Sequence, residues 1–446
     1  MLYRRGFGGW FIGLGTILCF WITPVLAQNP MNFDVVNNRD ETVYIYFANG
    51  VVDGTLPSSL GGGAIGSNIN NSDSIGYAVA PHSTLSGFTI NSFSGRVFVS
   101  AGETLESGNG SHFNNTSLAD YHKRFDHFEM TFATNNPLGG ANLTGTDFIS
   151  MPLELNNGSS TVKWNQANFA TALGNIMPAI KDQTTNQNGY AIVTGPQGIN
   201  VPGIGNVVRV IAPSTADAVP GFSPYGNIGS YHEAMRDELI GNQIHVMSDK
   251  YGNDFNLAGS VDAQGDVVLT RQDGEGTIGS LTLDSKFFTS KEIYKTNPYE
   301  ATIDGVFKTS FTSNEAAAMR DIFAGFNLGV WGSTEEIDGI ELGQMSSQQF
   351  FELGSTEYFF DAAQDNTNFY NEYAALIAAN SDNSVYGFPY SDVLGAQFIS
   401  LNPGGNPTLT LALSADAVPE PSGLILIGGL ATTTLLRRRR RNWITP

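Results

Sequence analysis

Two acidic side chains, Glu129 and Asp147, stand in segments that predict ordered strands, Phe125–Phe132 and Thr146–Ile149. In the first segment large apolar residues alternate, so Glu129 and Thr131 are expected on the opposite face. A sheltered carboxylate can serve as a general acid while a second one activates water, which is the chemistry of glycoside hydrolysis. From the residues alone, the alternative that both acids face solvent or hold structural hydrogen bonds stays open.

Other common site types are missing from the sequence. It contains no GxGxxG, P-loop, HExxH or GxSxG pattern. The only cysteine, Cys19, excludes disulfides within the chain. The histidines lack the spacing of metal ligands and are interpreted as surface or structural residues: His82, His112, His122, His127, His232 and His245. We therefore expect neither a metal nor a cofactor.

Composition and charge narrow the class of protein. The 446 residues include 51 glycines and 29 phenylalanines, and charged residues make up 14%. This composition favours a globular, β-rich chain. With 22 basic against 42 acidic residues, the net charge is -20, so a nucleic-acid partner is not expected.

The N-terminal 27 residues have the plan of a secretory signal peptide. Arg4 and Arg5 form a basic start, an apolar stretch follows, and Ala27 ends a small-residue cleavage site. Signal peptidase is then a processing partner, and the protein is expected to be exported. An uncleaved membrane helix is the alternative interpretation.

The last residues suggest a second processing signal. Pro419-Glu420-Pro421 precedes an apolar stretch shorter than the ~20 residues that span a bilayer, and Arg437 to Arg441 follow at once. This arrangement resembles the PEP-CTERM sorting tail. The resemblance implies transient membrane contact, recognition by an exosortase, and release to the cell surface or extracellular matrix of a Gram-negative-type bacterium.

Hydrophobic periodicity divides the body into three parts. Residues 28–158 have the period-two pattern of a β-barrel or sandwich. Residues 159–383 are predicted to interleave strands with helices as a mixed α/β domain, with helices at Tyr231–Ile244, after the capping box of Thr312 and Glu315, and at Tyr370–Ala379. Residues 384–416 return to β character and are expected to rejoin the first domain, before the tail at 417–446.

Several blocks together resemble one enzyme family. The segment Phe125–Phe132 and the block Ala141–Leu153 look like the core of glycoside hydrolase family 64, the β-1,3-glucanases of the thaumatin-like superfamily. Further similar blocks follow the family's order along the chain: Asn37–Asn38, Gly95–Ser100, Asn371–Ala374 and Tyr386–Val393. The resemblance spans most of the body.

The resemblance implies a thaumatin-like β-barrel or sandwich domain and an inserted α/β domain flanking a wide groove for β-1,3-glucan. It implies an inverting mechanism in which Glu129 is the general acid and Asp147 the general base, with no cofactor. The candidate substrate-binding residues are Thr131, Tyr386, Phe388, Tyr390 and Asp392. The three aromatics could stack on sugar faces or belong to the core, and Asp392 could instead cap a turn.

Two classes of function remain open at this point. The first is a surface-sorted hydrolase of β-1,3-glucan, which the presence of both acids favours. The second is a non-catalytic carbohydrate-binding protein of the extracellular matrix with the same fold. A structural surface-layer protein ranks behind both, because only acidity and glycine content support it.

Overall fold

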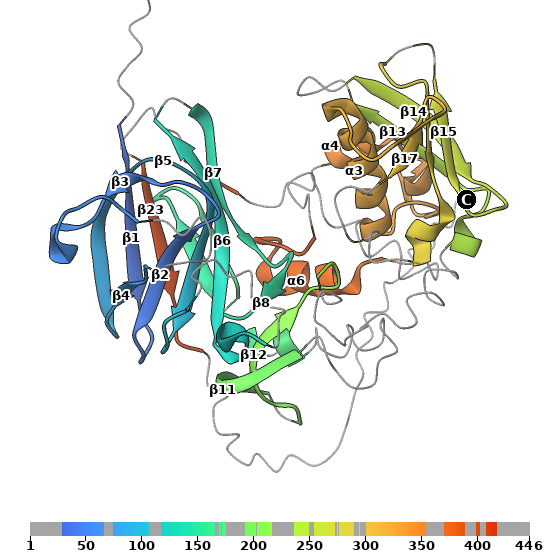
Figure 1. Ribbon diagram of the computed structural model, residues 1–446. Helices are drawn as coiled ribbons and strands as arrows, with labels where there is room; N and C mark the ends of the chain where they lie inside the picture. Colours follow the sequence, from blue (N-terminus) through green and yellow to red (C-terminus); the bar gives the residue numbers. More distant parts are fainter. Residues whose placement is uncertain are drawn as a thin grey trace, which may run out of the picture.

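The structure, a computed structural model, describes residues 29–66, 75–106, 117–134, 136–165, 169–170, 172–174, 192–201, 203–215, 236–248, 254–272, 274, 276–289, 294, 300–353, 370–388, 398–401 and 407–416. These residues are mostly β with few helices (Figure 1). The expected signal peptide and sorting tail lie outside the described residues. No helix in the described part of the chain is long and apolar enough to cross a membrane.

A barrel-like sheet of twelve strands forms the larger lobe, in the order β10-β9-β23-β1-β5-β6-β7-β21. Four further strands attach to this path: β2 and β3 pair with β5, β4 pairs with β2, and β22 pairs with β7. The strands are β1 (Met31–Asn37), β2 (Val43–Ala48), β3 (Asp53–Thr55), β4 (Tyr77–Val79), β5 (Ser83–Ala101), β6 (Phe125–Ala133), β7 (Asn136–Thr144), β9 (Leu153–Asn156), β10 (Thr161–Lys163), β21 (Val385–Tyr386), β22 (Ile399–Ser400) and β23 (Thr408–Leu413).

Strand β5 gives this sheet its barrel-like form. On one side its first half pairs with β1 and its second half with β6, while on the other side β3 and then β2 pair with it. The alternation expected in β6 is confirmed, because Phe128, Met130 and Phe132 are buried in the core while Glu129 and Thr131 lie on the other face. The sheet therefore presents one acidic side chain, Glu129, and one hydroxyl side chain, Thr131, away from its apolar core.

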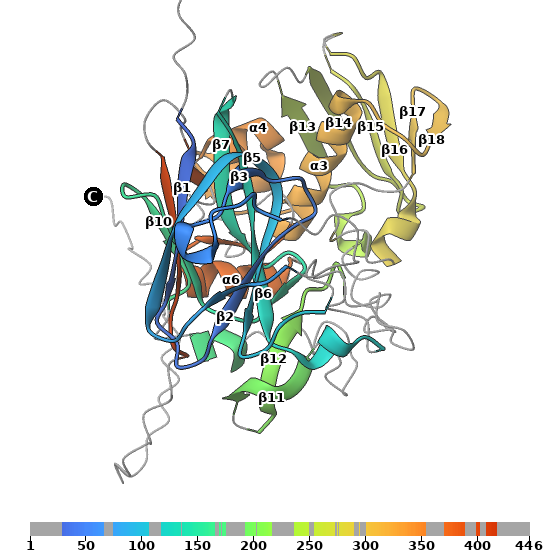
Figure 2. The same cartoon turned by 60° about the vertical axis from the view of Figure 1, so that its left-hand side comes forward.

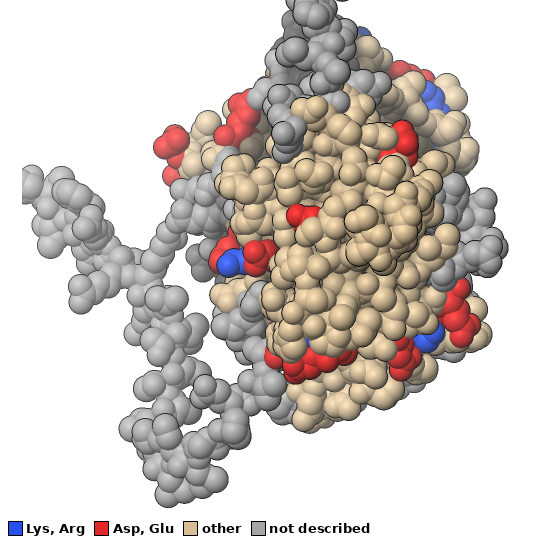
Figure 3. Space-filling model, turned by 90° about the vertical axis from the view of Figure 1, so that its left-hand side faces the viewer, with Lys and Arg blue, Asp and Glu red and all other residues tan. Residues whose placement is uncertain are grey.

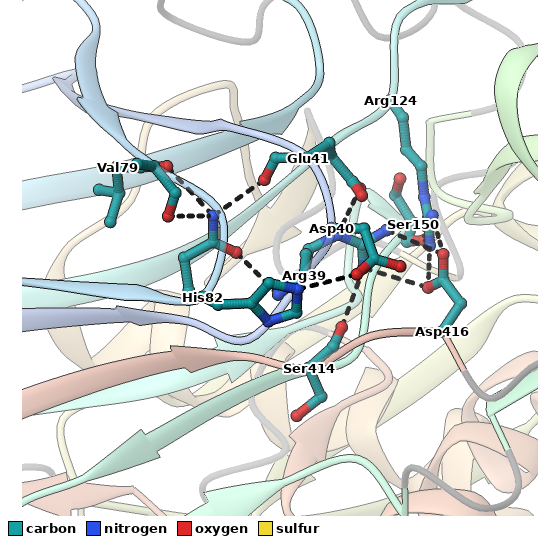
Figure 4. A network of polar contacts seen from close by, with 11 residues as sticks. Arg39, Asp40, Glu41, Val79, His82, Arg124, Ser150, Ser414 and Asp416 are labelled. Atoms are coloured by element: carbon teal, nitrogen blue, oxygen red, sulfur yellow. Dashed lines mark hydrogen bonds and ion pairs between the residues drawn. The ribbon is translucent and has the colours of Figure 1, made fainter.

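The first and last described strands are neighbours. Strand β23 lies between β1, to which it is parallel, and β9, to which it is antiparallel. Just beyond it, Asp416 accepts hydrogen bonds from the buried guanidinium groups of Arg39 and Arg124 (Figure 4). Arg39 also bonds the Ser414 carbonyl, and Arg124 bonds the Ser150 carbonyl. This cluster fastens the end of β23 to two other parts of the sheet.

A small three-stranded sheet extends the larger lobe. It has the order β11-β12-β8, formed by β11 (Ile192–Val201), β12 (Gly205–Ile211) and β8 (Phe148–Ile149). Because β8 directly follows Asp147, this sheet fixes the backbone on one side of that acid.

The second lobe differs from the expected α/β pattern. Six antiparallel strands follow one another, β13 (Gln243–Ser248), β14 (Phe255–Val261), β15 (Val267–Arg271), β16 (Ser280–Leu283), β17 (Ala301–Ile303) and β18 (Val306–Lys308). Strands interleaved with helices are therefore not what this segment shows, because each strand pairs antiparallel with its predecessor, as across the tight turn of Asp304 and Gly305 between β17 and β18. Of the helix expected at Tyr231–Ile244, residues 236–239 are helical, whereas its last two residues begin β13, where Ile244 and Val246 are buried at period two.

Helices cover one side of this second sheet. The capping box of Thr312 and Glu315 is confirmed and opens α3 (Ser313–Leu328). Helix α4 (Ser347–Glu352) packs beside it against β13. Further elements are the hairpin of β19 (Glu336–Ile337) and β20 (Ile340–Glu341), helical residues at 169–170, 172–174 and 236–239, and the 3-10 turns Ser58–Leu60, Ala119–His122, Ser285–Thr289 and Leu342–Gln344.

Helix α6 (Glu372–Ser381) lies between the two lobes (Figures 1 and 2). The expected helix at Tyr370–Ala379 is thus confirmed with its start two residues later. Its Tyr373 and Ile377 belong to the core of the large sheet, whereas Ala374 belongs to the core of the second lobe. One short helix therefore contributes side chains to both cores.

The outer side of the larger lobe, which carries β1 to β4, is poor in charge. Figure 3 shows a broad surface of uncharged side chains with acidic residues near its margins and few basic ones. Asn32, Thr84 and Thr410 are among the residues on the outward positions of these strands and their neighbours.

Candidate functional site

Glu129 stands in the middle of β6, on the face turned away from the main core. In the sheet register it lies between Arg96 of β5 and Asn142 of β7. Its side chain is 40% exposed. The central position in three paired strands fixes its backbone, while its carboxylate remains open to solvent.

Asp147 lies in the short connection between β7 and β8, and its backbone is held from several sides. The Ala212 amide and the Thr215 hydroxyl both donate to its carbonyl oxygen, at 2.9 and 2.8 Å. One residue earlier, the Ser214 hydroxyl donates to the Thr146 carbonyl. Its side chain is only 17% exposed. A connection fastened in this way positions a carboxylate almost as rigidly as a strand does.

Gly145, two residues before Asp147, is held by both α6 and β21. The Tyr373 hydroxyl donates to the Gly145 carbonyl at 2.6 Å, and the Gly145 amide donates to the Tyr386 carbonyl at 2.7 Å. A Cβ on residue 145 would come within 2.8 Å of the Ile149 side chain, so glycine is needed for this close packing. The helix between the lobes thus touches the segment that carries the second acid.

Arg96 joins the two acids. Its Nη1 donates to Oδ2 of Asp147 at 2.6 Å, and its Nη2 lies 3.3 Å from Oε1 of Glu129. Burial alone would lower the pKa of Arg96, but the charges of Asp147 and then Glu129 raise it above its ordinary value. The cationic guanidinium group of Arg96 therefore lies between two carboxylates, one from β6 and one from the β7–β8 connection.

Behind this surface lies a layer of buried polar groups. His127, on the same face of β6 as Glu129, is fully buried, and its Nε2 lies 3.9 Å from Oδ2 of Asp147. Its neighbour Asp126 points the other way and accepts backbone hydrogen bonds from His127, Ser150 and Met151. Burial nevertheless raises the pKa of Asp126 to about 7.

The candidate substrate-binding residues are distributed unevenly. Thr131 is exposed two residues beyond Glu129, and its hydroxyl lies 3.1 Å from that of Ser94. Tyr386 is only 8% exposed, and Phe388 is 3% exposed within the core of the second lobe, which favours the core role for both rings. Tyr390 and Asp392 lie outside the described residues.

Sequence reasoning found the two acids but missed Arg96 and His127. Arg96 carries a visible signal, because it is a charged residue within an otherwise apolar strand segment, Gly95–Ser100. His127 carries one as well, because it shares the face of Glu129 at period two. Assigning either residue to the site requires the pairing of β5 with β6, which brings Arg96 opposite Glu129.

Solved structures with a similar fold are β-1,3-glucanases. The crystal structure of a laminaripentaose-producing β-1,3-glucanase in complex with laminaritetraose is similar with a TM-score of 0.54 and 17% identity, covering 88% of this chain and 99% of the other. A β-1,3-glucanase domain from Clostridium beijerinckii has a TM-score of 0.52 and 16% identity, covering 86% and 98%. No curated protein matches the sequence.

Two carboxylates that converge on one exposed face of a β-rich fold are the arrangement typical of glycoside hydrolases. The match of most of the sequence to a family supports the same class. The profile of glycoside hydrolase family 64, described as β-1,3-glucanase, matches residues 31–411. The chain belongs to this family and is a glycoside hydrolase.

Proposed function

We propose that this protein hydrolyses β-1,3-glucan by inversion, with Glu129 as general acid and Asp147 as general base. The observation that carries the proposal is the convergence of both carboxylates on the guanidinium of Arg96. The laminaritetraose bound by a similar enzyme supports the choice of glucan as substrate. The family match supports the choice of reaction.

The contacts of the two acids with Arg96 support this assignment of roles. Asp147 is the less exposed acid and has the shorter contact with Arg96, which fixes its carboxylate beside the place of the attacking water and supports the role of general base. Glu129 has the longer contact and is more exposed, so a sugar can cover it. Covering it removes water, which favours the neutral carboxylic acid that donates a proton to the leaving oxygen.

The reaction then follows from the positions of these groups. Glu129 protonates the glycosidic oxygen as the bond to the anomeric carbon breaks. Asp147 takes a proton from a water molecule that attacks the opposite face of the sugar. Arg96 keeps the pair close to electrically neutral while the proton moves from water to Asp147 and from Glu129 to the leaving group. Thr131 and Ser94 offer exposed hydroxyls to the sugar beside the acids.

Laminarin hydrolysis by the purified chain tests this proposal. We expect the wild type to release reducing ends, and Glu129→Gln and Asp147→Asn each to lower kcat by about 10²–10⁴-fold. Glu154→Gln on β9, remote in the sheet order, is the matched control and should stay active. Proton NMR of the first product should show the inverted anomer. Full activity in both variants, or a retained anomer, would contradict the mechanism, and glucan binding without release would favour the non-catalytic alternative.

We also propose that the protein is exported and sorted to the cell surface. The support is sequence-based: the signal peptide pattern at 1–27 and the Pro419-Glu420-Pro421 tail. Mass spectrometry of the protein recovered from outside a host that carries an exosortase should give a chain that begins at Gln28 and lacks the terminal arginines. A recovered chain with both ends intact would refute this proposal.

A further inference from the structure

His127 is a buried histidine without a hydrogen bond. Its side chain is completely buried, and neither ring nitrogen has a hydrogen-bond partner in the described part of the chain. A buried polar group left unpaired costs stability, so its presence calls for a physical reason. The mechanism described so far does not use it.

The ring is held in one plane and points at Asp147. It stacks on Phe98, with ring centroids 5.1 Å apart and an angle of 22°, and it packs against Phe148 at 4.9 Å. Its Nε2 lies 3.9 Å from Oδ2 of Asp147, and its Nδ1 lies 3.9 Å from Oδ1 of Asp126. The two aromatic contacts leave the ring little freedom to turn away from either carboxylate.

Burial and the charged groups around the His127 ring determine its protonation state. Burial lowers the pKa of His127 well below its ordinary value, and the nearby cation Arg96 of β5 lowers it further. The acids near the ring are Asp126, the preceding residue of β6, and Asp147 from the β7–β8 connection, and Glu129 lies two residues further along β6. The ring is therefore neutral at neutral pH, with one nitrogen that donates and one that accepts.

Two further titratable groups lie behind this shell. Arg209 of β12 lies over the rings of Phe125 and Phe148, and the hydroxyl of Tyr373 of α6 is close enough to Asp126 and Asp147 for their charges to raise its pKa. Burial is the larger cause of that raised pKa, so Tyr373 stays neutral and adds no charge beside His127.

We propose that His127 is a positioning residue for Asp147, which it holds through a hydrogen bond from Nε2–H to Oδ2 during the reaction. This inference rests on the proposed role of Asp147 as general base. A shift of about 1 Å would shorten the present 3.9 Å separation to hydrogen-bond length. Arg96 now donates to the same oxygen. When a bound sugar accepts a hydrogen bond from Arg96, the Asp147 carboxylate is free to move toward His127.

The advantage of histidine here is that it donates without carrying charge. A second cation beside Asp147 would weaken its attraction for the proton of water, whereas a neutral N–H fixes the carboxylate orientation with less effect. With Oδ2 held by His127 once the sugar engages Arg96, Oδ1 accepts the proton of the attacking water. The two oxygens of one carboxylate then have separate tasks.

Kinetics of two variants of the full chain test this role on laminarin. His127→Phe keeps the stacking but removes the N–H, so we expect kcat to fall about tenfold with KM unchanged. The acid limb of the pH–rate profile should move to higher pH, because a base without this donor takes up its proton more readily. His127→Gln, whose amide can reach the same place, should recover most of kcat. The matched controls are His245→Phe and His245→Gln in β13, which should change neither quantity.

Three results would overturn the proposal. The first is a wild-type kcat and pH profile in His127→Phe while Asp147→Asn is inactive. The second is a loss of kcat in both variants that merely follows a lower melting temperature. The third is independent of activity: nitrogen-15 NMR of the imidazole should show the proton on Nε2, and a proton on Nδ1 would direct the donor to Asp126 instead. A wild type that does not hydrolyse laminarin but has the Nε2–H tautomer would refute the proposed function and not the geometry inferred here.

Discussion

The hydroxyl of Tyr373 in α6 donates a hydrogen bond of 2.6 Å to the carbonyl of Gly145, two residues before Asp147. At the start of the same helix, the Asn371 side chain donates to the Asn327 side chain in α3. The segment carrying the second acid is thus connected, through one helix, to the second lobe. The position of Asp147 therefore depends on how α6 packs between the two lobes.

Removal of the Tyr373 hydroxyl should make the position of Asp147 less well fixed. In Tyr373→Phe, the buried Gly145 carbonyl loses a donor, so the free energy of unfolding should fall by about 1–3 kcal/mol. We expect kcat on laminarin to fall as well, because Asp147 is less firmly placed. Tyr77→Phe is the matched control, since it loses a hydroxyl bonded to the Gly66 amide far from the acids. An unchanged kcat in Tyr373→Phe would show that the contact serves stability alone.

For kcat, the planar two-nitrogen geometry of the Arg96 guanidinium group should matter more than its charge. Arg96→Lys keeps a cation but cannot contact both carboxylates with two separate nitrogens of a planar group. We expect kcat to fall by about 10²–10³-fold, as for other preorganised groups at a reacting centre. Arg236→Lys, which alters an exposed ion pair with Asp237, is the control and should leave kcat unchanged. Activity retained in Arg96→Lys would assign Arg96 a purely electrostatic role.

Stability should depend on Asp416 in strong acid. Hydrogen bonds and charge from Arg124 and Arg39 outweigh burial and lower the pKa of Asp416 to about 2. Because the folded pKa lies below the unfolded value of about 3.9, the carboxylate stabilises the fold fully above pH 4 and this contribution, about 2.5 kcal/mol, is lost as the pH falls through 2. Melting temperatures measured across this window should fall for the wild type.

The variant Asp416→Asn should lack this acid dependence. It should also unfold more easily at neutral pH, by about 3–5 kcal/mol, because two buried guanidinium groups lose their shared anion. Asp338→Asn, on the β19–β20 hairpin, is a matched control that should match the wild type throughout. An identical acid transition in Asp416→Asn and wild type would disprove this account of the cluster.

Phe388 should behave as a core residue. Phe388→Ala should lower the free energy of unfolding by about 3–5 kcal/mol, as for other buried aromatic truncations, with KM for laminarin unchanged. Denaturant unfolding and kinetics on one preparation check both quantities. Phe307→Ala, whose ring is 63% exposed on β18, provides the contrast and should cost little. A raised KM without loss of stability would restore Phe388 as a sugar-stacking residue.

Local patterns predicted local structure well. Alternation gave the face of Glu129, and the capping box gave the start of α3, because each depends on residues within one turn or strand. The helix expected at Tyr231–Ile244 is present at residues 236–239 but ends before β13, because apolar spacing over a few residues fits both periods until tertiary pairing decides. The expected interleaving of strands and helices is not found between β13 and β18, because these short strands pair with their sequence neighbours.

The site required more than local patterns. Arg96 meets Glu129 only through the register of β5 on β6, and it meets Asp147 only through the connection after β7. His127 looked like one of several unremarkable histidines until its burial and its distance to Asp147 were known. Non-local pairing decides which polar residues converge, and a single sequence does not show that pairing.

The parallel pairing of β1 with β23 determines at which ends of the sheet the chain enters β1 and leaves β23. Asn32 lies beside Thr408 and Asn37 beside Leu413, so the chain enters β1 at one end of the sheet and leaves β23 at the other. Six paired residues separate these ends by roughly 20 Å. A fluorophore attached ahead of Met31 and a resin linkage placed after Asp416 would therefore point in opposite directions, which suits immobilisation of the protein with one terminus free.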